Sequence, residues 1–211
     1  MTWEKVTVEK YQAIFQLSEI KDEMDRVIAA ISILFDKSET EVNDMTVQEF
    51  NEYAKKCMFI FGDIPGKPVK TFKANGKKYA ICYDVTKMRF RQYAEISHFG
   101  SDTVGNIHLI MASIVQPVNW IGKRKRNKAE DHLIISQDIL KARFIDVFHA
   151  MVFFCSLFRS LIKSSKDYLV LKMMEELKME SYEAEMLLQD SMRDMDGFFQ
   201  RIKSQHWNES V

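Results

Sequence analysis

The densest group of side chains that could bind a ligand is a basic cluster in the middle of the chain. It holds five cations just behind an indole, and its members are Trp120, Lys123, Arg124, Lys125, Arg126 and Lys128. Such cations bind phosphates and an indole can stack on a base, which predicts contact with nucleic acid. The same cations could instead bind an acidic protein surface, or form a solvated loop balanced by Glu130 and Asp131. Because the chain has 30 cationic and 30 acidic side chains, its net charge gives no preference for nucleic acid.

Residues typical of catalysis and metal binding are present, but they do not fall into a working pattern. The five histidines lack the spacing of a zinc site. Residues 36–40 resemble the start of a calcium loop, yet Glu41 stands where glycine is required and Val47 where a bidentate glutamate is required. The glycine-rich motifs of nucleotide-binding proteins and hydrolases do not occur in the sequence. We therefore expect a non-enzymatic protein that uses no metal and no cofactor.

Three histidines have other expected roles. His149 lies on a strongly apolar helical segment, where a hydrogen-bonded interior histidine is the commonest state. His98 and His108 flank a glycine-containing turn and could approach each other, but the sequence supplies no third ligand beside them. These positions favour structural roles.

The cysteines and apolar segments indicate a soluble intracellular chain. Cys57, Cys82 and Cys155 are far apart, which predicts free, buried thiols in a reducing compartment. The N-terminus lacks the pattern of a secretory signal. The most apolar stretch, residues 144–162, is interrupted by charged side chains and predicts a buried helix rather than a membrane span.

Capping chemistry predicts several helices in the first third of the chain. Thr7 and Asp22 precede apolar residues at helical spacing. Thr46 and Glu49 have the spacing of a capping box, and Ser38 with Glu41 could cap a shorter turn.

Residues 69–83 change character and predict a small β-hairpin. Residues with β preference flank Asn75-Gly76, a dipeptide that favours the positive φ angles of a type I′ turn. Two strands alone are marginal in water, so we expect the hairpin to lie on the helical body or to be completed by another chain.

Helical patterns resume at residues 88–99, 104–115 and 138–162, with a loop from Pro117 through the basic cluster. The predicted fold is mainly α: a multi-helix bundle with one small β-hairpin and a long C-terminal amphipathic helix. The predicted division is a helical core domain over residues 1–163 and a helical extension over residues 164–211.

The region from Asp167 to Gln205 has no proline, and its apolar residues recur at steps of three and four, as in helix-on-helix packing. Six of the 13 methionines lie here, and methionine suits adaptable contact surfaces. This seam predicts a partner-binding surface or, alternatively, a helix folded back on its own core. The predicted partner-binding residues are Val170, Met174, Leu177, Leu188, Met195, Phe198 and Ile202.

Several stretches together resemble small morphogenesis proteins of tailed bacteriophages. They are the hairpin with Asn75-Gly-Lys, then Tyr93-Ala-Glu-Ile96, then residues 106–112 running into Gln116-Pro-Val118, with the helical segment 144–161 after them. The resemblance covers residues 40–160 and transfers no site residues. It implies a tail-assembly-chaperone-like protein or minor virion component, synthesised in the host cytoplasm and, in the second case, part of the virion.

The leading hypothesis is therefore a phage structural or assembly protein. It would act through multivalent contacts with other phage proteins or with copies of itself, without a membrane. The alternative is a nucleic-acid-associated factor that uses the basic cluster at residues 120–128.

Overall fold

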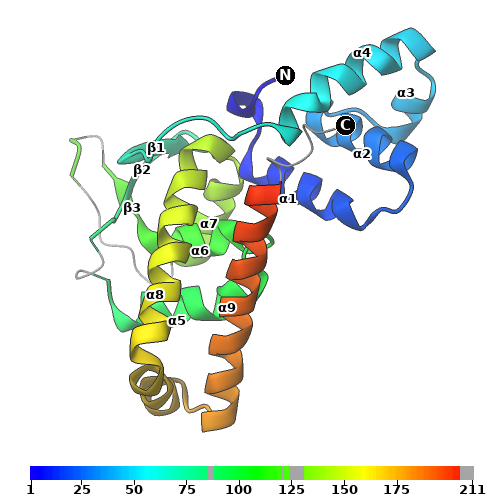
Figure 1. The fold of residues 1–211 in the computed structure, drawn as a ribbon. Helices are drawn as coiled ribbons and strands as arrows, with labels where there is room; N and C mark the ends of the chain where they lie inside the picture. Colours follow the sequence, from blue (N-terminus) through cyan, green and yellow to red (C-terminus); the bar gives the residue numbers. More distant parts are fainter. Residues whose placement is uncertain (85–87, 120, 124–130, 205–211) are drawn as a thin grey trace.

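The N-terminal part of the chain is a series of short helices (Figure 1). The computed structural model describes residues 1–84, 88–119, 121–123 and 131–204. The elements of this part are η1 (Trp3–Lys5), α1 (Val8–Gln16), η2 (Leu17–Glu19), α2 (Glu23–Phe35), α3 (Glu39–Asn43), α4 (Val47–Cys57) and η3 (Met58–Phe61).

The predicted helix starts in this part are confirmed. The side chains of Thr7 and Asp22 each accept a hydrogen bond from a backbone N–H in the first turn. Ser38 and Thr46 both form complete capping boxes, with Glu41 and Glu49 respectively. Local capping chemistry therefore sets where these helices begin.

The small sheet has three antiparallel strands in the order β1-β2-β3. β1 (Thr71–Ala74) and β2 (Lys77–Ile81) form the predicted hairpin, and Asn75 (φ 48°) and Gly76 (φ 74°) have the positive φ angles of its turn. β3 (Val115–Val118) pairs with β2 and completes the sheet within the same chain.

The prediction for residues 104–118 was partly wrong. The helix there, α6, spans only Ile107–Ile114, and the residues expected to end it and begin a loop form β3 instead. Pro117 lies opposite Tyr79 on this edge strand. An edge strand tolerates proline because the missing N–H can point away from the ladder.

The remaining helices are α5 (Phe90–Phe99), η5 (Gly100–Asp102), α7 (His132–Leu140), α8 (Phe144–Leu177) and α9 (Ser181–Ser204). The prediction of one helix over residues 138–162 placed its start wrongly, because α7 ends at Leu140 and α8 begins only at Phe144. α8 is kinked at Ser165, and its two parts, Phe144–Ser160 and Lys163–Leu177, are bent by 83°.

The predicted long C-terminal helix is present as α9, but the apolar seam from Asp167 to Gln205 does not lie on one continuous helix. α8 ends at Leu177, Lys178 takes a left-handed conformation (φ 55°), and α9 starts at Ser181. The second part of α8 and the first part of α9 are joined by the short turn at residues 178–180, at the end of the molecule remote from α2–α4 (Figure 1). We call this helix–turn–helix segment the C-terminal hairpin.

The core is centred on the first part of α8. Phe144, Val147 and Met151 are fully buried, and the ring of Tyr11 in α1 stacks on Phe144 at 3.6 Å between centroids. Backbone hydrogen bonds join Val6 to Phe144 and Val8 to Ala142. These contacts fix α1 and η1 against the core and so position the N-terminal helices.

Candidate protein-binding groove

The basic cluster is only partly within the described residues. Lys123 is exposed, and its backbone N–H donates to Asn119 Oδ1 at 2.7 Å in a tight turn after β3. Trp120, Arg124, Lys125, Arg126 and Lys128 lie outside the residues that the structure describes. The cluster therefore stays a prediction.

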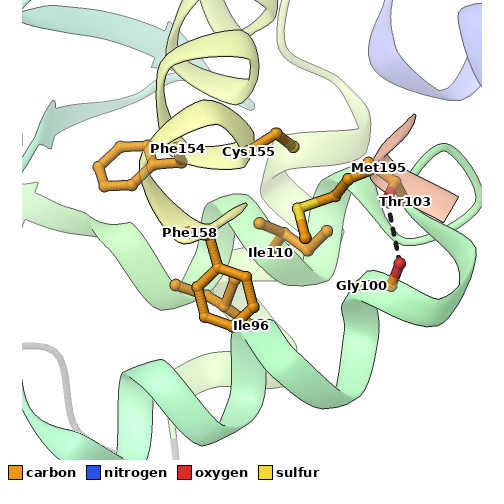
Figure 2. A pocket seen from close by; sticks show the side chains of 8 residues that line it. All are labelled: Ile96, Gly100, Thr103, Ile110, Phe154, Cys155, Phe158 and Met195. Atoms are coloured by element: carbon orange, nitrogen blue, oxygen red, sulfur yellow. Dashed lines mark hydrogen bonds between the residues drawn. The ribbon is translucent and has the colours of Figure 1, made fainter. Parts of the chain in front are cut away.

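The predicted C-terminal seam is largely covered by the chain itself. Val170, Leu188 and Met195 are between 1% and 7% exposed. Figure 2 shows Met195 of α9 among Cys155 and Phe158 of α8, Ile96 of α5 and Ile110 of α6, around a void of about 10 Å³. The expectation that this seam needs another polypeptide is corrected for these three residues, because their own core already covers them.

The other seam residues differ. Met174 is half-buried and Leu177 is 45% exposed, whereas the side chains of Phe198 and Ile202 lie outside the described part. Exposed apolar side chains of the C-terminal hairpin are on its other faces instead, and they include Leu171, Tyr182 and Met186. The hairpin thus retains an apolar surface, but not the one that the seam predicted.

A polar group around Ser113 contains a serine, a histidine and a carboxylate, so it was considered as a catalytic site. Ser113 Oγ donates to Glu95 at 2.9 Å and lies 3.1 Å from His132 Nε2. The same nitrogen lies 3.1 Å from the carbonyl oxygen of Leu109, which can only accept, so Nε2 carries the proton. A protonated nitrogen cannot take the serine proton, and this geometry does not activate Ser113.

Two further titratable groups of the described residues, His108 and Cys155, have pKa values shifted by burial. Burial and the nearby His132 lower the pKa of His108, which contacts Gln12. Burial raises the pKa of the Cys155 thiol to about 12. Across the described residues, no three His, Cys, Asp or Glu side chains gather as a metal site.

A large concave surface of the described chain is a groove among α1, α2 and α4, and residues of η2 and η3 also line it. We call it the N-terminal groove. Its volume is about 890 Å³, and most of its lining is apolar, with walls formed by Ile14, Phe15, Val27, Ala54, Ile60 and Met58. A protein pocket of a few hundred to 1,000 Å³ is large enough for a drug-sized ligand or for the anchoring side chains of a helix.

Trp3 lines the buried side of the groove. It is 5% exposed, and its ring packs edge-on against Phe59 and tilted against Tyr11. Its indole N–H is buried and has no hydrogen-bond acceptor among the described residues. Cys57 also lines this side, and burial raises the pKa of its thiol to about 11, so the thiol stays protonated at neutral pH.

The rim of the groove is open, and both its apolar and its charged side chains face solvent. Met58 is 61% exposed and Phe61 is 54% exposed. Two cations, Arg26 and Lys55, and one carboxylate, Glu23, line the same groove. None of these three takes part in the ion pairs that the structure describes.

Sequence reasoning missed this site, although a signal was present. The run Cys57-Met-Phe-Ile-Phe61 has five consecutive apolar residues, from the last residue of the amphipathic α4 through η3. One buried face needs only about every third or fourth residue to be apolar, so the run contains more apolar side chains than the core can cover. The surplus residues, Met58 and Phe61, are those that line the groove from the exposed side.

No protein-family model matches the chain, and no curated protein and no solved structure matches it either. Among the described helices, none is by itself long and apolar enough to cross a membrane. The two parts of α8 pass a test of length and composition only when they are taken together as a bent pair.

Proposed function

We propose that this protein is a non-enzymatic binding protein that acts in assembly, and that its N-terminal groove holds an acidic amphipathic helix of another polypeptide. The observation that carries the proposal is the open, apolar groove of about 890 Å³ with Met58 and Phe61 at its rim. Exposed apolar surface of this kind marks a binding site more often than an isolated exposed residue does.

The shape of the groove favours a helix over a small molecule. Ligand pockets usually bury most of the surface of a small molecule, whereas this groove has rim residues that are more than half exposed. An open channel between helices is the form that receives one face of an amphipathic helix. Methionine at the rim also adapts to different partner side chains.

The charges of the rim favour an acidic partner. Arg26 and Lys55 exceed the single carboxylate of Glu23, so the groove has a surplus of positive charge. Complementary charges steer association and fix the orientation of the bound helix, with only a modest effect on affinity.

For the biological setting, the proposal relies on the resemblance of the sequence to small morphogenesis proteins of tailed bacteriophages. We propose a role in the morphogenesis of a tailed bacteriophage, as a structural or assembly protein in the host cytoplasm or in the virion. The arrangement of the Ser113 group supports the non-enzymatic part of this proposal, because His132 cannot act as its base there.

Site-specific photo-cross-linking tests the proposed function. A photoreactive amino acid is placed at Met58 or Phe61 of η3, and at Val47 as a control, because Val47 is 78% exposed at the start of the preceding helix α4 but does not line the groove. The cross-linked peptides are then sequenced. We expect acidic, amphipathic helical peptides from the two groove positions. Equal yields at Val47, or no cross-linked peptide at all, would contradict the proposal.

A second candidate function is contact with nucleic acid, and the sheet supplies a specific reason for it. Lys73 of β1 lies directly opposite Lys78 of β2, and both are exposed. Like charges in directly opposite positions destabilise a sheet, so an anion between them would relieve the repulsion. Val118 of β3 pairs with Lys78 and is five residues before Lys123, so the sheet lies close to the start of the basic cluster.

The salt dependence of binding to a short DNA duplex tests this candidate. Replacing both lysines by glutamine (Lys73→Gln, Lys78→Gln) removes two phosphate contacts and should reduce the slope of log K against log salt by about 1.8. The matched control is Lys163→Gln with Lys172→Gln, which removes the same charge from α8. No binding at low salt, or equal effects of the two double variants, would rule the candidate out.

A further inference from the structure

The C-terminal hairpin ends in a tip with the properties that the N-terminal groove requires of a partner. We define the hairpin tip as residues 176–186. Tyr182 is 71% exposed and Met186 is 42% exposed, and they are one turn apart on the same face of α9. Leu177, 45% exposed, adds a third apolar side chain at the end of α8.

The exposed face of α9 is distinct from the face that packs on its own core. Ala184 and Leu188 are at most 1% exposed, and they hold the start of α9 against the rest of the chain. Tyr182 and Met186 are each two residues from Ala184, which places them on the opposite side of the helix. The tip thus consists of the end of α8, the turn at residues 178–180 and the start of α9, and Tyr182 and Met186 form an uncovered apolar face on it.

The tip and the groove have opposite charges. Glu176, Glu180 and Glu183 are exposed and take no part in the ion pairs that the structure describes. Arg26 and Lys55, which line the groove, are also exposed and outside the described ion pairs, but they carry positive charge. An acidic tip with tyrosine and methionine anchors therefore matches an apolar groove with a positive rim.

The two surfaces cannot meet within one molecule. The hairpin tip lies at the end of the structure remote from α2 and α4 (Figure 1). Two complementary surfaces at opposite ends of one chain form a head-to-tail contact between copies, which generates rings or filaments rather than a closed twofold dimer.

We infer that the hairpin tip of one copy occupies the N-terminal groove of a second copy, so that the protein self-associates head to tail. This inference rests on the proposed function, because it names the acidic amphipathic helix that the groove holds. Tyr182 inserts among the apolar side chains of the groove, and the carboxylates of the tip lie near Arg26 and Lys55.

Mixing two association-defective variants tests the inference. Tyr182→Asp changes the tip and Met58→Asp changes the groove, and both side chains are largely exposed, so both variants should fold. Light scattering after gel filtration should show wild-type oligomers that grow with concentration, and monomers for each variant alone. An equimolar mixture should form a 1:1 dimer, because one intact tip and one intact groove remain. The dimer should weaken at least about tenfold when salt is raised enough to shorten the Debye length to a few ångströms.

A wild-type protein that stays monomeric, or a mixture that does not associate, would overturn the inference. A synthetic acidic amphipathic peptide unrelated to this chain separates this failure from a failure of the proposed function. If the peptide binds wild type at least about tenfold more tightly than it binds Met58→Asp, the groove function stands and only the partner is wrong. If it binds neither, both proposals fail.

Discussion

Asp138 is the residue that fastens the β-hairpin to α7. It is 3% exposed and accepts hydrogen bonds from Asn75 Nδ2 at 2.7 Å, Lys77 Nζ at 2.7 Å and the hydroxyl of Tyr79 at 2.5 Å. These donors are between 59 and 63 positions away in sequence. The role of Asp138 could not be predicted from local pattern, whereas the caps and the Asn75-Gly76 turn could, because those depend on neighbours within four residues.

Removing the carboxylate of Asp138 should destabilise the protein far more than removing the positive charge of Lys77, its ion-pair partner. Asp138→Ala leaves the buried hydroxyl of Tyr79 without its acceptor and should lower the free energy of unfolding by about 1–3 kcal/mol. Lys77 is 55% exposed and can be solvated, so Lys77→Gln should lower it by less than about 1 kcal/mol. Urea unfolding of both variants gives the comparison, and equal losses would show that the buried hydroxyl is not the determining group.

The same network predicts a loss of stability in acid. Burial alone would raise the pKa of Asp138, but the hydrogen bonds from Lys77, Tyr79 and Asn75 together hold this pKa below its usual 3.8. The stabilisation is therefore complete above the unfolded pKa and is lost as the pH falls through the lower folded value.

Thermal melts over the pH range below about 5 measure this effect. The Tm of the wild type should fall more steeply with decreasing pH than that of Asp138→Asn, which has no carboxylate to protonate. Hydrogen bonds from Ser38 and Thr46 also lower the pKa values of Glu41 and Glu49, so both proteins should lose some stability in acid. Parallel curves for the two proteins would contradict the assignment to Asp138.

Among the elements, α9 changes most between sequence and structure. Its apolar positions were correctly placed on a helix, but the chain bends at Lys178 and buries Met195 in its own core. Gly100 and Ser191 explain how α9 comes so close: a Cβ on Gly100 would lie 3.3 Å from Ser191 Cβ. Periodicity identifies an apolar face, but it cannot tell whether that face meets the same chain or another one.

Substitution of two methionines of α9 distinguishes a face that packs on the same chain from one that is free to meet another chain. Met195→Ala should lower the free energy of unfolding by about 2–5 kcal/mol, because Met195 is buried and the substitution leaves a cavity. Met186→Ala, at a 42% exposed position, should change it by about 0.5 kcal/mol or less. Chemical unfolding of the monomeric protein checks both values. If Met195→Ala changes the free energy of unfolding only slightly, the core does not depend on Met195, and this residue would again be a candidate for contact with a partner.

In the molecule as a whole, the sequence predicts a mainly helical chain with a small β-hairpin, and the structure confirms this class. The third strand and the N-terminal groove could not be predicted in the same way. β3 depends on pairing between residues far apart in sequence, such as Tyr79 and Pro117, which are 38 positions apart. The apolar run 57–61 indicates surplus apolar surface, but the groove itself depends on how three separately recognised helices pack beside Trp3, which no local pattern gives.

The most direct test of the proposed groove is the affinity of the cross-linked helix, synthesised as a peptide, for matched variants in η3 and α4. Calorimetry should show that Met58→Asp weakens binding at least about 30-fold, the effect of removing an interface residue worth about 2 kcal/mol. Val47→Asp, which adds the same charge to α4 outside the groove, should change the affinity by less than about twofold. If Val47→Asp weakens binding as much as Met58→Asp, or if neither does, the N-terminal groove is not the binding site.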